Sequence, residues 1–411
     1  MPANTELISK ESAAAIAPQS ERKTAPVLRI AFLVWQTVLY LTLTVFLLEA
    51  FFYFARVGDS EHTRPDRQVG YKLFANKRIT QRKEGFGCFK LNSFGMQNDE
   101  VPMAKAPGVY RVAVFGDSYV EALHVPRDSN FISVIEARLR KETGRPVEVL
   151  NFGVSNYSVA QDYLRYQTLG RKFKPDLVIQ TFRVEEIGKL LPVNTTNLLF
   201  VRPVYFADYE GHIKYDDTCV RNYYLSREGK RMLATDWLRE YSRIWGVIGL
   251  MRENWASFSE TVKPAVSFFN GGAAAAPVAS FTLPTDETRK NYANCYWYMM
   301  EAQLAAFARD CRADGARFMF LRTPMIRPGM HELTHSPTET ALLEKTALKL
   351  NVPLLNLDRD YRSFVGCTTD DGTNFSAGGH FTQPMHRWVG ERTAAFLLQE
   401  GLLDADGNGL P

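Results

Sequence analysis

The fold of this chain is indicated most clearly by the stretch Tyr110-Arg111-Val112-Ala113-Val114-Phe115-Gly116-Asp117-Ser118. Its first six residues are mostly β-formers, and continuous apolar character of this kind is typical of a buried parallel strand. The small residues that follow predict a turn that lifts the Ser118 hydroxyl out of the carboxyl end of the strand. Open α/β sheets collect their ligand and catalytic groups at that edge. A plain strand-to-helix turn, with Asp117 or Ser118 as its N-cap, is the alternative interpretation.

Further apolar segments continue the pattern along the chain, and helical periodicity separates them. Such alternation favours parallel βαβ units with right-handed crossovers. We therefore expect an α/β fold, a flavodoxin-like three-layer sandwich with about five parallel strands. The predicted strands are Tyr110–Phe115, Val147–Phe152, Asp176–Phe182, Arg317–Arg322 and Val352–Leu357, and the predicted helices are Phe131–Thr143, Val159–Phe173, Asn291–Ala313, Thr338–Leu350 and Met385–Gln399.

Composition divides the chain into five parts. They are a disordered tail (1–26), a transmembrane helix (27–55), a covering segment (56–108), the α/β domain (109–400, with an inserted helical region at 190–289) and a C-terminal tail (401–411). The insert contains an amphipathic pattern over Met232–Phe258, which we expect to pack on the main domain. A groove-lining or membrane-surface role is the alternative for this pattern, given its tryptophans. An Ala/Gly tract, Gly271–Ala276, is typical of a flexible link.

The transmembrane prediction depends on the segment Ile30–Leu48, which contains no charged residue and continues as apolar sequence to Phe54. This length is sufficient to cross a hydrocarbon core about 30 Å thick. A cleaved signal peptide is the alternative, but its apolar core is usually shorter, and no small-residue cleavage site follows. Cations precede the span closely, which favours a cytoplasmic N-terminus. We expect a single-pass inner-membrane protein whose C-terminal domain lies in the periplasm or outside the cell.

Charge and cysteine usage narrow the function. The formal net charge is +4 over 411 residues, without a basic block, so the sequence offers no electrostatic footprint for nucleic acid. The five cysteines show no C-x-x-C spacing. His331-Glu332-Leu333-Thr334-His335 matches the H-E-x-x-H zinc pattern, which requires a helix, but prolines bracket it too closely for one. We expect neither a metal nor a cofactor.

Polar clusters follow the predicted strands. The first contains Ser118, and Gly153 follows the second strand, where a glycine lets a backbone N–H approach a substrate oxygen. Arg183 follows the third strand and could bind an anionic group or form a surface ion pair. His380 lies between Gly378-Gly379 and the last predicted helix. An imidazole there could take the proton of Ser118, as nucleophilic catalysis by serine requires.

The order of these motifs resembles the SGNH (GDSL) hydrolase superfamily. Val112–Ser118 is similar to its first block, Asn151–Ser155 to its second, and Gly379–His386 to its last. The segments Gly70-Tyr71 and Asn92–Gly95 also resemble membrane-anchored members from bacterial envelope polysaccharide loci. The resemblance implies Ser118 as nucleophile and His380 as general base, with the N–H groups of Ser118 and Gly153 as the oxyanion hole.

Two blocks depart from the family pattern. The family usually has Asn-Asp after the third strand, where this chain has Val184-Glu185, and an Asp two or three positions before the histidine, where it has Ala377 and Gly378. A base without its carboxylate works poorly, because the carboxylate fixes the tautomer. The auxiliary candidates for these missing groups, besides Asp117 of the first block, are Arg183 for the donor and Asp370, Asp371 or Asn374 for the carboxylate.

Two functions therefore stay open. The first is a membrane-anchored serine esterase or O-acyltransferase acting on acyl groups of an envelope or exported polysaccharide. The second is a catalytically degenerate subunit that binds glycan or helps to assemble a polysaccharide synthesis, modification or export complex. The expected partners are an acylated glycan, the lipid bilayer and a membrane-bound acyltransferase or export complex. We favour the enzyme, because Ser118 and His380 are both present.

Overall fold

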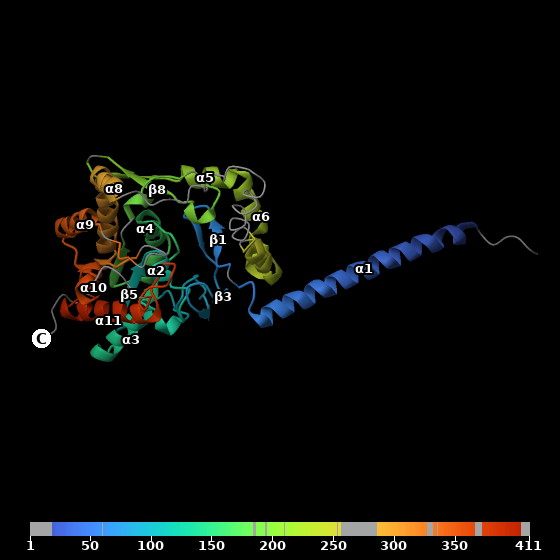
Figure 1. The fold of residues 1–411 in the computed structure, drawn as a ribbon, viewed down its shortest axis with the longest axis horizontal. Coiled ribbons are helices and arrows are strands. Elements are labelled where there is room, and N and C mark those ends of the chain that lie inside the picture. The colour runs from blue at the N-terminus through green and yellow to red at the C-terminus, as the bar shows by residue number, and fades with distance from the viewer. Residues whose placement is uncertain are drawn as a thin grey trace, which may run out of the picture. The chain divides into compact units, whose positions relative to one another are not determined.

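The computed structural model describes residues 19–403, apart from 60, 184–185, 194, 209, 253, 256–285, 327–331, 335 and 366–371. The chain divides into an N-terminal unit, Met1–Arg56, and a compact unit, Val57–Pro411. The compact unit contains the sheet and all of the candidate site residues (Figure 1). Its central sheet is parallel and has five strands, in the order β11-β10-β7-β5-β6. These strands are β5 (Tyr110–Phe115), β6 (Val147–Asn151), β7 (Leu177–Phe182), β10 (Arg317–Arg322) and β11 (Leu354–Asn356).

The strand order follows the flavodoxin-like pattern, in which the chain starts near the middle of the sheet, moves one strand to one side and then returns to build the other side. The predicted α/β class is therefore confirmed. The polar ends of β5 and β7 lie next to each other, because these two strands are hydrogen-bonded neighbours. This topology brings the residues after Phe115 close to those after Phe182.

Helices cover both faces of the sheet. One face carries α3 (Phe131–Thr143) and α11 (Gln383–Gln399), and the other carries α4 (Val159–Thr168), α8 (Asp286–Ala313) and α9 (Pro337–Leu350). Side chains alternate along β5, so that Val112 and Val114 pack with α3 and α11, and Ala113 and Phe115 pack with α4 and α8. Burial on both faces explains why β5 has no polar alternation in the sequence.

Two predicted helices end differently in the structure. The predicted helix Val159–Phe173 stops at Thr168 and continues as a 3₁₀ turn, Gly170–Phe173. Gly170 lies against the ring of Phe115, where a Cβ would collide. The pattern predicted over Met232–Phe258 is divided. Helix α6 spans Arg227–Tyr241, the chain is extended at Ser242, and a second helical stretch follows over 243–252.

The break at Ser242 has a local cause. The Ser242 hydroxyl accepts a hydrogen bond from the N–H of Trp245 at 3.1 Å, so it caps the helical stretch that begins there. Ser226 caps α6 in the same way through the N–H of Gly229. Residues 256–258 of the predicted pattern, and the tract Gly271–Ala276, lie outside the described residues.

The covering segment is more regular than its sequence suggests. It contains two antiparallel hairpins, β1 (Thr63–Asp66) with β2 (Gly70–Leu73), and β3 (Arg78–Gln81) with β4 (Gly87–Lys90). The insert adds a third hairpin, β8 (Val204–Ala207) with β9 (Ile213–Asp216), followed by α5 (Thr218–Leu225) and α6. The remaining short helices are α2 (Ser118–Glu121) and α10 (Leu357–Val365).

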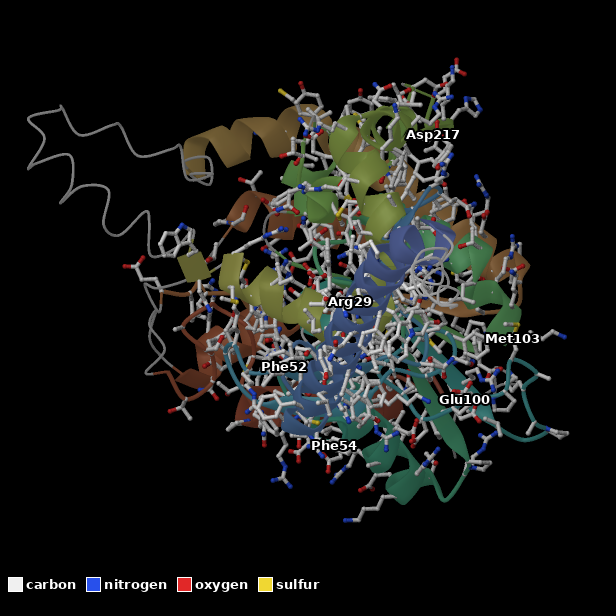
Figure 2. The ribbon with its side chains drawn as sticks, turned by 90° about the vertical axis from the view of Figure 1, so that its right-hand side faces the viewer. Arg29, Phe52, Phe54, Glu100, Met103 and Asp217 are labelled. Atoms are coloured by element: carbon white, nitrogen blue, oxygen red, sulfur yellow. The ribbon has the colours of Figure 1, made fainter. Side chains whose placement is uncertain are left out.

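The N-terminal helix, α1, spans Gln19–Ala55 and so begins inside the segment that we expected to be disordered. Its part Pro26–Ala55 is long and apolar enough to cross a membrane, with a mean hydropathy of 2.0, and none of it is buried. Figure 2 labels Arg29 near its start and Phe52 and Phe54 near its end. The Phe54 side chain is 80% exposed. These properties are those of a membrane anchor or of a signal sequence.

Candidate active site

The nucleophile candidate lies at the first turn after β5. Ser118 begins α2, and the side chain of Asp117 caps this short helix by accepting from the N–H of Tyr119. Gly116 precedes them, and a Cβ at Gly116 would collide with the side chains of Thr181 and Val120. The glycine is therefore needed for the tight exit from the strand. Ser118 itself is partly exposed.

His380 lies in a loop that is fixed on several sides. Its backbone N–H donates to the Ser376 hydroxyl at 3.1 Å, and the hydroxyl of Tyr119 donates to the carbonyl of Gly379 at 2.5 Å. The imidazole stands beside the Tyr119 ring, with 5.1 Å between the ring centroids. The residue that follows the nucleophile therefore also positions the base.

The structure brings Ser118 and His380 together across 262 residues of sequence. His380 Nε2 lies 2.7 Å from Ser118 Oγ. This is a hydrogen-bond distance for a serine hydroxyl and an imidazole nitrogen. The two residues that the family resemblance pairs as nucleophile and base thus have the geometry that proton transfer between them requires.

A third group completes this contact, and we did not predict it from the sequence. Glu84 Oε2 lies 2.7 Å from His380 Nδ1, on the opposite side of the ring from Ser118. A carboxylate can only accept, so Nδ1 carries the hydrogen, and Nε2 is left to accept from the Ser118 hydroxyl. The hydrogen bond from His380, together with that from Ser376, lowers the pKa of Glu84 to about 2, so this carboxyl is ionised at neutral pH.

Glu84 reaches the site from the turn between β3 and β4. This residue has a positive φ of 63°. Gly85 and Gly87 beside it lie directly on the backbone carbonyls of His124 and Leu123, where a Cβ on either glycine would collide. The glycines thus let the hairpin turn lie against the segment that follows α2. The only sequence signal for this arrangement is an acidic residue beside the glycines of Gly85-Phe86-Gly87.

The carboxylate of Glu84 occupies the place next to Gly378. A Cβ built on Gly378 would collide with the Glu84 carboxyl group. The Ser376 hydroxyl donates to Glu84 Oε2 at 2.6 Å and so holds the carboxylate there. Gly378 is one of the two positions at which the family resemblance leads us to expect an aspartate. An aspartate at position 378 and the Glu84 carboxylate therefore cannot both fit in this space.

Asp117 and Arg183 have partners other than the His380 ring. The Asp117 carboxylate is buried and accepts hydrogen bonds from two guanidinium nitrogens of Arg183. It also accepts one from the Lys189 ammonium group at 3.1 Å. Burial acts to raise the pKa of Asp117, but the charges of Arg183 and Lys189 outweigh it and hold the pKa below its usual value. The Arg183 guanidinium also lies over the Tyr119 ring, 4.3 Å from its centroid. Because Asp117 also caps α2, this ion-pair cluster holds the turn that carries Ser118.

The two candidate oxyanion donors differ in their surroundings. Among the described residues, no acceptor faces the backbone N–H of Ser118, so this group can donate to a substrate oxygen. The N–H of Gly153 already donates to Asn151 Oδ1 at 3.0 Å. A Cβ at Gly153 would collide with the backbone of α2 at Val120 and Glu121. Gly153 therefore allows the second block to pack directly on the helix that carries the nucleophile.

The candidates that we expected for the carboxylate role were Asp370, Asp371 and Asn374. Asp370 and Asp371 lie outside the described residues. The backbone carbonyl of Asn374 accepts from the N–H of Thr382 at 2.9 Å and so closes the loop that carries His380. The Nδ1 atom of His380, which any substitute would have to contact, is bound by Glu84.

Two further histidines line the buried side of the site. His124 Nε2 lies 2.7 Å from the carbonyl of Phe381, and burial lowers the pKa of His124. His386 is fully buried on α11, and burial lowers its pKa well below the usual value. Its Nδ1 accepts from the N–H of Phe131 at 3.3 Å. Both rings are therefore neutral in the folded protein at pH 7.

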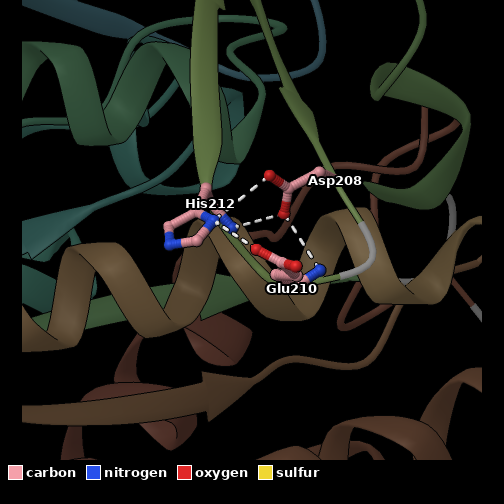
Figure 3. A group of neighbouring side chains, drawn as sticks. All are labelled: Asp208, Glu210 and His212. Atoms are coloured by element: carbon pink, nitrogen blue, oxygen red, sulfur yellow. Dashed lines mark hydrogen bonds and ion pairs between the residues drawn. The ribbon is translucent and has the colours of Figure 1, made fainter.

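One metal-binding pattern of the sequence, and one acidic and histidine cluster in the described part of the chain, lie outside this site. Glu332 and Leu333 of the H-E-x-x-H pattern lie in an extended bridge instead of a helix, and His331 and His335 are outside the described residues. Asp208, Glu210 and His212 meet at the exposed turn between β8 and β9 (Figure 3). Their contacts are those of a hairpin turn, in which Asp208 accepts from the backbone N–H of His212 at 2.9 Å.

No family model and no curated protein matches this sequence. Several solved structures match it. The acetyl xylan esterase AlAXEase is 11% identical, and the match covers 70% of this chain and 99% of that chain with a TM-score of 0.36. Axe2, an acetylxylan esterase from Geobacillus stearothermophilus, is 10% identical, and the match covers 74% of this chain and 96% of that chain with a TM-score of 0.36. A GDSL-like lipase from Bacteroides thetaiotaomicron is 12% identical, and the match covers 71% of this chain and 87% of that chain with a TM-score of 0.30.

Proposed function

We propose that this chain is a membrane-anchored serine esterase or O-acyltransferase of the SGNH type, acting on acyl groups of an exported or envelope polysaccharide. One observation carries the proposal. His380 lies between Ser118 Oγ and Glu84 Oε2, at 2.7 Å from each. A hydroxyl, an imidazole and a carboxylate in this order are the groups that activate a serine.

The reaction follows from these contacts. Ser118 Oγ attacks the carbonyl carbon of the ester while its proton moves to His380 Nε2. The N–H of Ser118 binds the oxyanion, and Glu84 stabilises the imidazolium through Nδ1–H. The bond to the leaving alcohol then breaks, and His380 returns the proton to that oxygen. An acyl group remains on Ser118.

The second half of the reaction decides between hydrolysis and transfer. Water that attacks the acyl-serine releases a carboxylic acid, whereas a sugar hydroxyl that attacks it forms a new ester. In both cases His380 takes the proton of the attacking group and returns one to Ser118 Oγ. The two residues are partly exposed, which suits an ester on a polymer better than a small buried substrate.

The membrane part of the proposal is supported by α1. Its exposed apolar length is sufficient to cross a bilayer, and the resemblance to anchored family members from polysaccharide loci supports a substrate at the cell envelope. An anchored esterase that faces away from the cytoplasm would meet polysaccharide during export or at the cell surface.

The proposal is tested by labelling the detergent-solubilised full chain with a fluorophosphonate probe, which reacts with activated serines. We expect the wild type to be labelled and Ser118→Ala to be unlabelled. Release of acetate from acetylated xylan should fall by about 10²-fold or more in His380→Ala, the range that general base catalysis contributes. Ser363→Ala, at an exposed serine of α10, is the matched control and should behave as the wild type. Equal labelling of wild type and Ser118→Ala would exclude this mechanism.

A further inference from the structure

Helix α6 presents an exposed stripe of cations and aromatic rings. Its exposed residues recur three or four positions apart, so they lie on one side of the helix. In order along the helix they are Arg227, Lys230, Arg231, Ala234, Trp237 and Tyr241. The side chains of Trp237 and Tyr241 are 66% and 62% exposed, and their ring centroids lie 5.9 Å apart. Two neighbouring exposed aromatic rings are unusual on a surface that contacts only water.

Two acidic residues of α6, Asp236 and Glu240, lie near β1, and Glu240 also accepts from the hydroxyl of Tyr241 at the end of the stripe. Asp236 forms an ion pair with Arg64 of β1, and Glu240 lies 3.7 Å from the same guanidinium. The three carboxylates of α6, at Glu228, Asp236 and Glu240, are all partly buried. The stripe is therefore cationic and aromatic, without an exposed carboxylate of its own helix. This combination is typical of a helix that lies on a membrane surface with anionic lipids.

The chain itself limits how far this face lies from α1. Helix α1 ends at Ala55, and Gly58 packs backbone to backbone on Gly246 of the helical stretch 243–252, where a Cβ on either glycine would collide with the other segment. Asp59 holds the contact through Arg243, at 2.5 Å from its Nε. Three residues span at most about 11 Å. The covalent link between α1 and this helical stretch is therefore short.

We propose that α6 and the helical stretch 243–252 bind the lipid surface from which α1 emerges. The rings of Trp237 and Tyr241 enter the interfacial layer, and Arg227, Lys230 and Arg231 contact anionic headgroups. The exposed Met251 extends the apolar contact on the second stretch. The inference rests on the membrane anchor of the proposed function and does not depend on the esterase chemistry.

The test uses the full chain in vesicles of three parts phosphatidylcholine to one part phosphatidylglycerol, with or without bromine on the phosphatidylcholine acyl chains near the headgroup. Bromine quenches tryptophan fluorescence on contact. All variants carry Trp35→Phe, which removes the tryptophan of α1. The contribution of Trp237 is the emission of the Trp35→Phe variant minus the emission of the double variant Trp35→Phe/Trp237→Phe. We expect brominated lipid to lower that contribution at least about twofold, as for an interfacial ring.

Trp388 on α11 is the matched control, measured as the difference made by Trp388→Phe, and it should be insensitive to bromine. Replacing Lys230 and Arg231 by Gln should reduce the quenching of Trp237, as should vesicles without phosphatidylglycerol. A Trp237 contribution that bromine leaves unchanged would overturn the proposal in favour of a protein partner. Alkaline extraction of the vesicles reports on the anchor, and release of the chain would overturn the anchor and this inference together. Loss of esterase activity affects neither readout.

Discussion

The carboxylate of Glu84 fills the space that a side chain at Gly378 would need. The two residues are 294 positions apart in the sequence, and the side chain of one determines the space left for the other. A glycine at 378 leaves room for the carboxylate, and the carboxylate supplies the charge that a residue there would otherwise bring to His380. The degenerate last block of the sequence is therefore not by itself a sign of lost catalysis, because a hairpin from another part of the chain carries the acid.

Replacing Glu84 by Gln should slow catalysis with little change in folding. The amide keeps the shape of the side chain but cannot stabilise an imidazolium, so we expect kcat for p-nitrophenyl acetate to fall on the order of a hundredfold or more. Glu100→Gln is the matched control, since Glu100 belongs to the same covering segment and accepts hydrogen bonds from Ser93. An unchanged kcat in Glu84→Gln would show that His380 needs no carboxylate.

Moving the carboxylate to position 378 should restore part of the activity. Gly378→Asp alone should be impaired, because the new side chain displaces Glu84. In the Glu84→Ala background the same substitution meets an empty space, and we expect kcat to rise at least about tenfold over Glu84→Ala, a gain of about 1.4 kcal/mol in transition-state stabilisation. Gly378→Asn in the same background provides the uncharged comparison. If kcat with Gly378→Asp is no higher than with Gly378→Asn, a carboxylate at position 378 cannot replace that of Glu84.

Asp117 should prove to be a stability residue as well as part of the first block. Its buried carboxylate binds Arg183 and Lys189, and its removal leaves two largely covered cations without their shared partner. Asp117→Ala should lower the free energy of unfolding by about 3–5 kcal/mol, measured by urea denaturation in detergent. Glu391→Ala removes the exposed partner of Arg387 and should cost about 0.5 kcal/mol or less. Similar costs for the two variants would contradict the assigned role of the cluster.

His386 should make the fold sensitive to mild acid. Burial lowers its pKa in the folded state well below the unfolded value of about 6.5, so the unfolded chain binds the additional proton. The free energy of unfolding must then fall as the pH drops below about 6.5. We expect urea midpoints to decrease between pH 7.5 and 5.5, and to decrease less in His386→Gln, whose amide oxygen can still accept from Phe131. His212→Gln, at an exposed turn, should keep the full dependence.

Much of the fold and half of the site follow from simple sequence rules. Runs such as Val112–Phe115 are apolar without interruption because both faces of the strand are buried, and parallel strands end at one edge of the sheet. That reasoning leads to Ser118 directly. His380 followed from its place between two glycines and the last predicted helix, and the family resemblance then paired it with Ser118 as general base.

Glu84 could not be found in this way. It lies on a hairpin turn whose strands have four residues each, and its contact with His380 spans 296 positions. The glycines beside it are explained only by the backbone of His124 and Leu123, which no local pattern reveals. The helix break at Ser242 was missed for a related reason, since the apolar periodicity continues across a residue that ends one helix and caps the next.

The position of Glu84 so early in the chain has a practical and biological consequence. A recombinant fragment limited to residues 109–400 would keep Ser118 and His380 but lack Glu84, so we expect any esterase activity of that fragment to be lower than that of the full chain. Because Glu84 lies in the turn between β3 and β4, we expect proteolytic cleavage of that turn to weaken its contact with His380 while the central sheet stays folded.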